Sequence, residues 1–149
     1  MSENNTTVGE KAVELLVEHG YGPKEEIQGC TEEEIRELES EFNISLPEAY
    51  KSCMRHIGKH TNGFLRGSEF TYPYMKDLRE YAVDMIERQD VEFEFEDTDF
   101  VFMGHQGYSF FYFNTQNGSN PPVYLFMSPD EPNKEADSFS EWLFDEIRS

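Results

Sequence analysis

The stretch Phe100–Ser128, FVFMGHQGYSFFYFNTQNGSNPPVYLFMS, decides the fold. Its turn formers divide it into three predicted strands, Asp99–Met103, Tyr108–Asn114 and Val123–Met127. In the middle strand, Phe110 and Tyr112 point to one face. Phe111 and Phe113 point to the other face. A strand that is aromatic on both faces has to be covered on both, so we expect it to be central in a sheet with helices packed against it.

Helical periodicity predicts the elements that provide this cover. The predicted helices are residues 9–19, residues 31–42, one with Ser45 as its cap and Pro47 in its first turn, one that starts at Pro73, and residues 139–148, capped by Ser138. Thr31 and Glu34 have the spacing of a capping box. Two further strands are predicted at residues 64–70 and 91–95. The predicted fold class is α+β: a mainly antiparallel sheet of about five strands packed against N-terminal helices and a C-terminal helix.

Length and cysteine content limit the class of protein. The length of 149 residues is typical of one domain, which we predict at residues 9–149. We predict a flexible tail at residues 1–8. The first residues lack the apolar segment of a secretory signal, and no apolar run approaches the roughly 20 residues of a membrane span. Cys30 and Cys53 are too few for a disulfide framework, so we expect reduced thiols and a cytoplasmic protein. Nothing specifies an oligomer, and a monomer or weak dimer is expected.

The chain is strongly acidic. It has 31 Asp and Glu against 12 Lys and Arg, which gives a net charge of −19. Such a surface repels nucleic acid and anionic membranes, so we expect neither as a partner. It attracts basic proteins and accelerates their encounter. An acidic surface that serves only solubility, or a salt-rich host, explains the same charge, and both interpretations stay open.

The acids concentrate around the predicted strand at residues 91–95. There Phe93 and Phe95 point inward, whereas the intervening glutamates point outward. One interpretation is a solvated edge strand that its charges protect from aggregation. The other is a docking surface for a basic protein, in which an acidic rim sets the approach and nearby aromatic rings set the affinity. The candidate partner-binding residues are Glu92, Glu94, Glu96, Asp97, Asp99, Tyr108 and Tyr112.

Catalytic and metal-binding motifs are absent from the sequence. There is no GxSxG, HExxH, P-loop or dinucleotide-binding pattern, so we expect no enzyme, no cofactor and no metal. His56 and His60 have a spacing that suits a metal, but no third ligand lies near them in sequence. Cys53 lies on the apolar stripe of a helix, where a buried structural thiol is more common than a nucleophile. A hydrolase that uses surface carboxylates remains a third functional alternative.

Three segments, in this order, resemble the SUKH superfamily. They are Thr31–Met54, TEEEIRELESEFNISLPEAYKSCM; Val101–Asn114, where a Gly-rich turn leads into an aromatic strand; and Pro122–Leu143, with its Ser-Phe-xx-aromatic-Leu helix. The residues that match are Glu41, Leu46, Pro47, Tyr50, Gly104, Gly107, Ser138, Phe139 and Trp142. Most of these residue types are structural, because Leu-Pro fixes a helix start and glycine permits a positive φ. The chain departs from the pattern where IGKHT precedes Asn62, and where Tyr108 replaces a common acidic residue.

The resemblance implies a non-enzymatic protein-binding domain. The superfamily includes yeast cell-wall-assembly regulators tied to killer-toxin resistance, and many bacterial immunity proteins. The first expectation is therefore an immunity protein that neutralises a polymorphic, basic, nuclease-type toxin by direct binding. The alternative is a regulatory or scaffold protein of cell-wall or signalling machinery.

Overall fold

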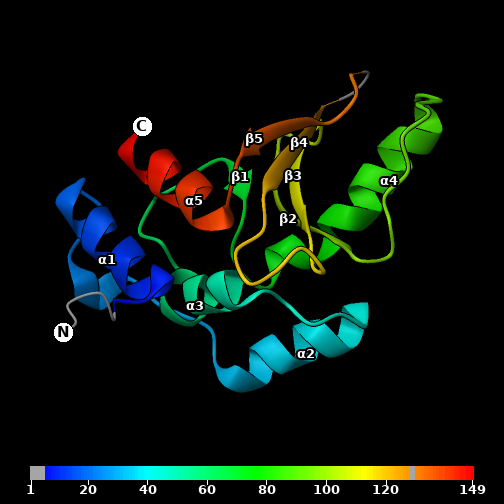
Figure 1. Cartoon of the computed structure of the whole chain (residues 1–149). Coiled ribbons are helices and arrows are strands. Elements are labelled where there is room, and N and C mark those ends of the chain that lie inside the picture. Colours follow the sequence, from blue (N-terminus) through cyan, green and yellow to red (C-terminus); the bar gives the residue numbers. More distant parts are fainter. Residues whose placement is uncertain (1–5, 128–129) are drawn as a thin grey trace.

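The computed structural model describes residues 6–127 and 130–149 (Figure 1). The described helices are α1 Val8–Glu18, α2 Glu32–Phe42, α3 Glu48–Ile57, α4 Leu78–Arg88 and α5 Phe139–Arg148, with short 3₁₀ turns η2 Lys24–Glu26 and η3 Tyr74–Asp77. The described strands are β1 Ser68–Glu69, β2 Asp99–His105, β3 Ser109–Asn114, β4 Val123–Met127 and β5 Asn133–Ala136. Residues 1–5 of the predicted tail lie outside the described residues.

The sheet confirms the predicted α+β class. Within the described part of the chain its strand order is β1-β2-β3-β4-β5, and every neighbouring pair is antiparallel (Figure 1). The aromatic strand β3 is central, as predicted. Tyr112 of β3 lies opposite Val101 of β2 and Tyr124 of β4, so these three side chains share one face of the sheet.

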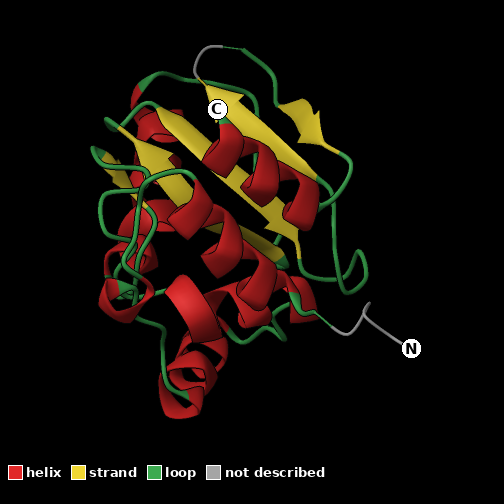
Figure 2. Cartoon of the chain, turned by 90° about the vertical axis from the view of Figure 1, so that its left-hand side faces the viewer, coloured by secondary structure: helices red, strands yellow, loops and turns green. Residues whose placement is uncertain are grey.

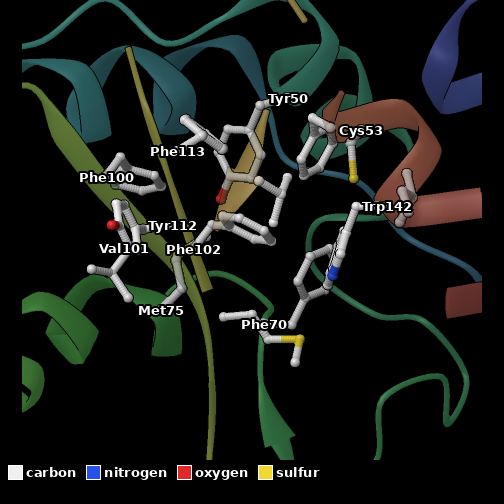
Figure 3. Close-up of a cluster of buried hydrophobic side chains, with 14 of the residues drawn as sticks. Tyr50, Cys53, Phe70, Met75, Phe100, Val101, Phe102, Tyr112, Phe113 and Trp142 are labelled. Carbon is white, nitrogen blue, oxygen red and sulfur yellow. The ribbon is translucent and has the colours of Figure 1, made fainter. Parts of the chain in front are cut away.

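Helices α3 and α5 cover the other face. Figure 2 shows α5 in front of the strands, and α1 packs outside α3 and α5. Tyr50 of α3 contacts Phe113, with ring centroids 5.3 Å apart, and Phe139 of α5 contacts the same ring at 5.9 Å. Phe102 lies between Phe113 at 5.2 Å and Trp142 at 4.8 Å (Figure 3). All five side chains are buried, so this face is a closed aromatic core.

The face that carries Tyr112 is covered by α4 and by the irregular segment that follows this helix. In Figure 1 this segment runs back along α4 before the chain enters β2. Phe95 contacts Tyr112 at 5.1 Å, and Phe93 contacts Phe126 at 5.0 Å. Gly104 of β2 lies so close to α4 that a Cβ there would come within 2.6 Å of Leu78. A single helix and a thin segment therefore replace the helix pair of the opposite face.

The prediction of a strand at residues 91–95 was wrong. Phe93 and Phe95 point inward as expected, but they pack down onto β3 and β4. The segment therefore lies over the sheet instead of extending its edge, and it pairs with none of the strands that the structure describes. The fifth strand is instead β5, in a stretch where no strand was predicted, and its Ala136 pairs with Val123.

Two smaller predictions also need correction. Of the strand predicted at residues 64–70, only Ser68–Glu69 forms, because the preceding chain turns through positive φ angles at Leu65 (59°) and Gly67 (90°). Ser45 does not cap α3. Pro47 is the N-cap, and Glu39 accepts the nearby Leu46 N–H at 2.8 Å.

The start predicted at Pro73 was wrong, because the 3₁₀ turn η3 comes first and α4 begins only at Leu78. The predicted caps at Thr31 and Ser138 are confirmed. Thr31 and Glu34 form the predicted capping box of α2, in which each side chain accepts the other residue's backbone N–H. Thr7 and Glu10 form a second capping box, so α1 starts at Val8, one residue before its predicted start. Ser138 accepts the N–H of Glu141 at 3.2 Å and caps α5.

Candidate functional site

The acidic segment at residues 91–96 is held in place by contacts with helix α4. Arg79 of α4 donates to the backbone carbonyls of Asp99 at 2.7 Å and Glu96 at 3.1 Å. Its guanidinium also lies over the ring of Phe95, 5.4 Å from the centroid. These contacts hold the buried side of the segment, and Glu92, Glu94 and Glu96 remain exposed on its outer side.

One hollow, the tyrosine hollow, lies between this segment and strands β3 and β4. Its volume is about 480 Å³, and it is lined by Phe93, Glu94, Glu96, Asp99, Tyr112, Asn114, Gln116, Asn117 and Tyr124. Four of the seven predicted partner-binding residues therefore line the same hollow. The rings of Tyr112 and Tyr124 stack at its base, with centroids 5.6 Å apart and planes at 28°.

Tyr112 brings a phenol hydroxyl to the tyrosine hollow. Its side chain is only 7% exposed, and no described residue forms a hydrogen bond with its hydroxyl. Burial, together with the nearby Asp99 carboxylate, raises the pKa of Tyr112. The phenol therefore stays neutral at physiological pH and can donate or accept a hydrogen bond from a bound group.

The carboxylates around the hollow have different roles. Asp99 is only 9% exposed. Its carboxylate accepts hydrogen bonds from the Glu96 N–H and from the Asn114 amide, both at 2.9 Å, and so holds the turn that leads into β2. Asn114 also donates to Glu96 at 3.1 Å. Glu94 makes no hydrogen bond or ion pair with a described residue and is exposed. The carboxylates of Glu94 and Glu96 are therefore the ones that a partner can reach.

A second hollow, the acidic hollow, shares the lining residue Phe93 with the tyrosine hollow. Its volume is about 580 Å³, and it is lined by Gln89, Asp90, Val91, Glu92, Phe93, Asp130, Glu131 and Pro132. The predicted partner-binding residue Glu92 lines the acidic hollow and not the tyrosine hollow. Four carboxylates line this second hollow.

Two predicted partner-binding residues lie outside both hollows. Asp97 is exposed in the turn before β2. Tyr108 is 46% exposed in the turn between β2 and β3, at the opposite end of β3 from Asn114, and contacts the ring of His105. The sequence did not identify Phe93 or Tyr124 as site residues. Tyr124 could be found only from the register that places it opposite Tyr112.

Most residues that match the family pattern lie in the core. Leu46, Pro47 and Gly104 are buried, Tyr50, Phe139 and Trp142 belong to the closed aromatic face, and Ser138 caps α5. Gly107 turns the chain between β2 and β3 with a φ of 80°, which favours glycine. Glu41 is exposed and forms an ion pair with Lys76 at 2.9 Å. These positions shape the fold and lie outside the two hollows.

The histidines and cysteines form no reactive centre among the described residues. Helix α3 ends at Ile57, so His56 and His60 do not share one helical face, and His56 bonds instead to the Ser52 carbonyl at 3.0 Å. No three His, Cys, Asp or Glu residues of the described chain come together as a metal site. Burial raises the pKa of Cys53, which is fully buried, and raises the pKa of Cys30 to about 12, so neither thiol is readily ionised.

A larger hollow of about 610 Å³ follows the outer side of α1. Glu10, Glu14 and Glu18 line it together with Val13, Val17, Lys24 and His56. Here Lys24 offsets part of the acidic charge, and the described lining residues include no aromatic ring other than that of His56 and no tyrosine hydroxyl. The tyrosine hollow combines two exposed carboxylates, stacked rings and a hydroxyl that bonds to no described residue, so it is the candidate site.

Comparison with known proteins identifies a family. The model of the SMI1 / KNR4 family (SUKH-1) matches residues 29–145, which is most of the chain. No curated protein matches the sequence. Among the described residues, no helix has the length and apolar character needed to cross a bilayer.

Proposed function

Because the chain belongs to the SMI1 / KNR4 family (SUKH-1), we propose that it is an immunity protein that binds a basic toxin and occludes its active site. Membership in this family fits an immunity or a regulatory role. The observation that favours a basic protein partner is the tyrosine hollow, in which the exposed carboxylates of Glu94 and Glu96 line the same hollow as two stacked aromatic rings.

The tyrosine hollow has the groups that recognise an arginine or lysine side chain. A cation is stabilised over the face of a tyrosine ring. A guanidinium group also pairs with a carboxylate through two parallel hydrogen bonds. Tyr124 offers the ring, Glu94 and Glu96 offer the carboxylates, and Tyr112 offers an acceptor hydroxyl. The chain already uses the same chemistry where Arg79 lies over Phe95.

A nuclease-type toxin suits this surface. The active cleft of a nuclease has to attract phosphate, and is therefore positively charged. A protein with a net charge of −19 draws such a cleft towards itself, and this attraction weakens as salt is added. Occupation of the cleft by the acidic surface then excludes the nucleic acid.

The test uses the toxin encoded beside the gene for this protein. We expect the purified protein to bind this toxin in a defined stoichiometry and to inhibit it. The double variant Glu94→Lys/Glu96→Lys should weaken binding at least tenfold. The matched control is Glu25→Lys/Glu26→Lys on η2, which changes the net charge equally at exposed positions outside both hollows.

Two outcomes would contradict the proposal. Absence of both binding and inhibition removes the immunity function. Equal weakening by the two double variants shows that net charge alone governs binding, without a defined site. Binding without inhibition instead favours the regulatory or scaffold role.

A further inference from the structure

The segment at residues 91–96 has the side-chain pattern of a strand but pairs with none of the described strands. Glu92, Glu94 and Glu96 are exposed and alternate with the inward residues Val91, Phe93 and Phe95. In an extended chain, alternate residues lie roughly 7 Å apart on the same side. The outer side of the segment is therefore a row of carboxylates with the repeat of a β-strand.

The middle of this segment, residues 92–95, also lacks backbone hydrogen bonds with the described residues. The bond from Val91 N–H to Ile86 and the bond from Glu96 N–H to Asp99 delimit the free stretch, with distances of 3.1 and 2.9 Å. Between them, residues 92–95 form no backbone hydrogen bond with any described residue. An extended stretch with free N–H and C=O groups is what a strand from another protein pairs with.

The two hollows lie in succession along this segment. Both are lined by Phe93, and their opposite wall comes from Tyr112, Tyr124 and residues 130–132. Among the described lining residues, four carboxylates belong to the acidic hollow and three to the tyrosine hollow, and neither hollow has a Lys or Arg. Lys134 lies opposite Tyr124 on β5, but its ammonium group is paired with Asp137 at 2.7 Å. The hollows thus form one acidic groove beside an unpaired strand.

We infer that this groove binds an extended segment of the partner with basic side chains at alternate positions. That segment pairs with the backbone of residues 92–95 and places cations in both hollows, on either side of Phe93. The inference rests on the proposed function, and specifies which part of the basic partner is recognised. A partner helix fits less well, because its backbone groups are already used within the helix.

The first experiment tests backbone pairing with a labelled peptide of five Ser-Arg repeats, whose binding is followed by fluorescence anisotropy. Two charge-matched peptides carry N-methyl groups, one on every arginine amide and the other on every serine amide. Only one of these sets of amides faces the protein when the peptide is extended. We expect one N-methylated peptide to bind at least tenfold more weakly than the other. Equal affinities of the two, or no binding of the parent peptide, would overturn the inference.

The second experiment locates the peptide. Hydrogen exchange of the amides of residues 92–95 should slow at least tenfold when the parent peptide binds. The variants Glu94→Lys/Glu96→Lys and Glu92→Lys/Glu131→Lys should each weaken binding at least tenfold, and Glu25→Lys/Glu26→Lys is the control with the same change in charge. Binding that depends on the tyrosine hollow alone, or that leaves these amides unprotected, overturns the extended mode but retains the proposed site. Equal effects of all three variants overturn the proposed site as well.

Discussion

The two faces of the sheet are covered in different ways. On one face, α3 and α5 enclose a set of aromatic rings that have almost no exposure, and two of the polar atoms there, the Tyr50 hydroxyl and Trp142 Nε1, have no partner among the described residues. On the other face, α4 and the segment at residues 91–96 leave Phe93 half-buried and the Tyr112 hydroxyl free for a ligand. The face under α3 and α5, the closed face, therefore serves stability. The face under α4, the open face, gives up some burial for a binding surface.

The largest effect is expected on the closed face. Phe139 is fully buried and contacts Tyr50, Phe102, Phe113 and Trp142. Phe139→Ala removes these contacts and leaves a cavity, so it should lower the free energy of unfolding by about 3–5 kcal/mol. Urea denaturation followed by tryptophan fluorescence measures this change. A loss below about 1 kcal/mol would contradict a tightly packed core on this face.

A smaller loss is expected on the open face. Phe93 is half-buried, so Phe93→Ala should cost about 1–2 kcal/mol of stability. The same variant should weaken binding of the basic partner, because Phe93 lines both hollows. Denaturation and binding measured on one preparation separate the two effects. A stability loss equal to that of Phe139→Ala would show that the two faces are packed alike.

On the helical side, pH provides a further test. Hydrogen bonds from Lys59 and from the Thr31 backbone hold the pKa of Glu34 below its usual 4.5. A carboxyl with a lowered folded-state pKa stabilises the protein above pH 4.5, and this stability is lost as the pH falls through the folded-state value. In Glu34→Gln the dependence of stability on pH below about 4.5 should become shallower. Glu33→Gln, on the same helix turn, makes the same change in charge and is the matched control. Equal pH profiles of the two variants would contradict the prediction.

The smallest effect is expected for Tyr50→Phe. The Tyr50 hydroxyl is buried without a partner, so its removal sacrifices no hydrogen bond and relieves a desolvation cost. The free energy of unfolding should stay the same or rise by up to about 1 kcal/mol, as thermal denaturation can show. A loss of more than about 1 kcal/mol would mean that the hydroxyl has a hydrogen-bond partner.

The sequence predicted local elements better than it predicted their pairing. β4 and α5 have their predicted bounds, because turn residues and the Ser138 cap mark their ends. The alternation at residues 91–95 correctly indicated which side chains point inward. It carries no information on whether the backbone pairs with a neighbour, and here the phenylalanines draw the segment over the sheet. The short, charged strand β5 gave no signal, because its pairing depends on β4 and not on its own burial.

The candidate site was predicted in part for a related reason. Charge density along the chain identified Glu94, Glu96 and Asp99, which do lie together. The sequence could not show that Asn114 ties Asp99 into a turn, or that Tyr124 stacks on Tyr112, since both contacts depend on strand register. Tyr108 was selected because it is aromatic and near the central strand, but it lies at the other end of β3.

The two buried thiols have a practical consequence for measuring motion in this molecule. Cys53 is fully sealed in the core and Cys30 is 7% exposed, and both resist conversion to the reactive thiolate. An alkylating reagent can therefore label them only during transient opening of the helical side. The rate of labelling would report how often that side opens, without any engineered probe, while the carboxylate-lined groove on the far side of the sheet is free to exchange partners.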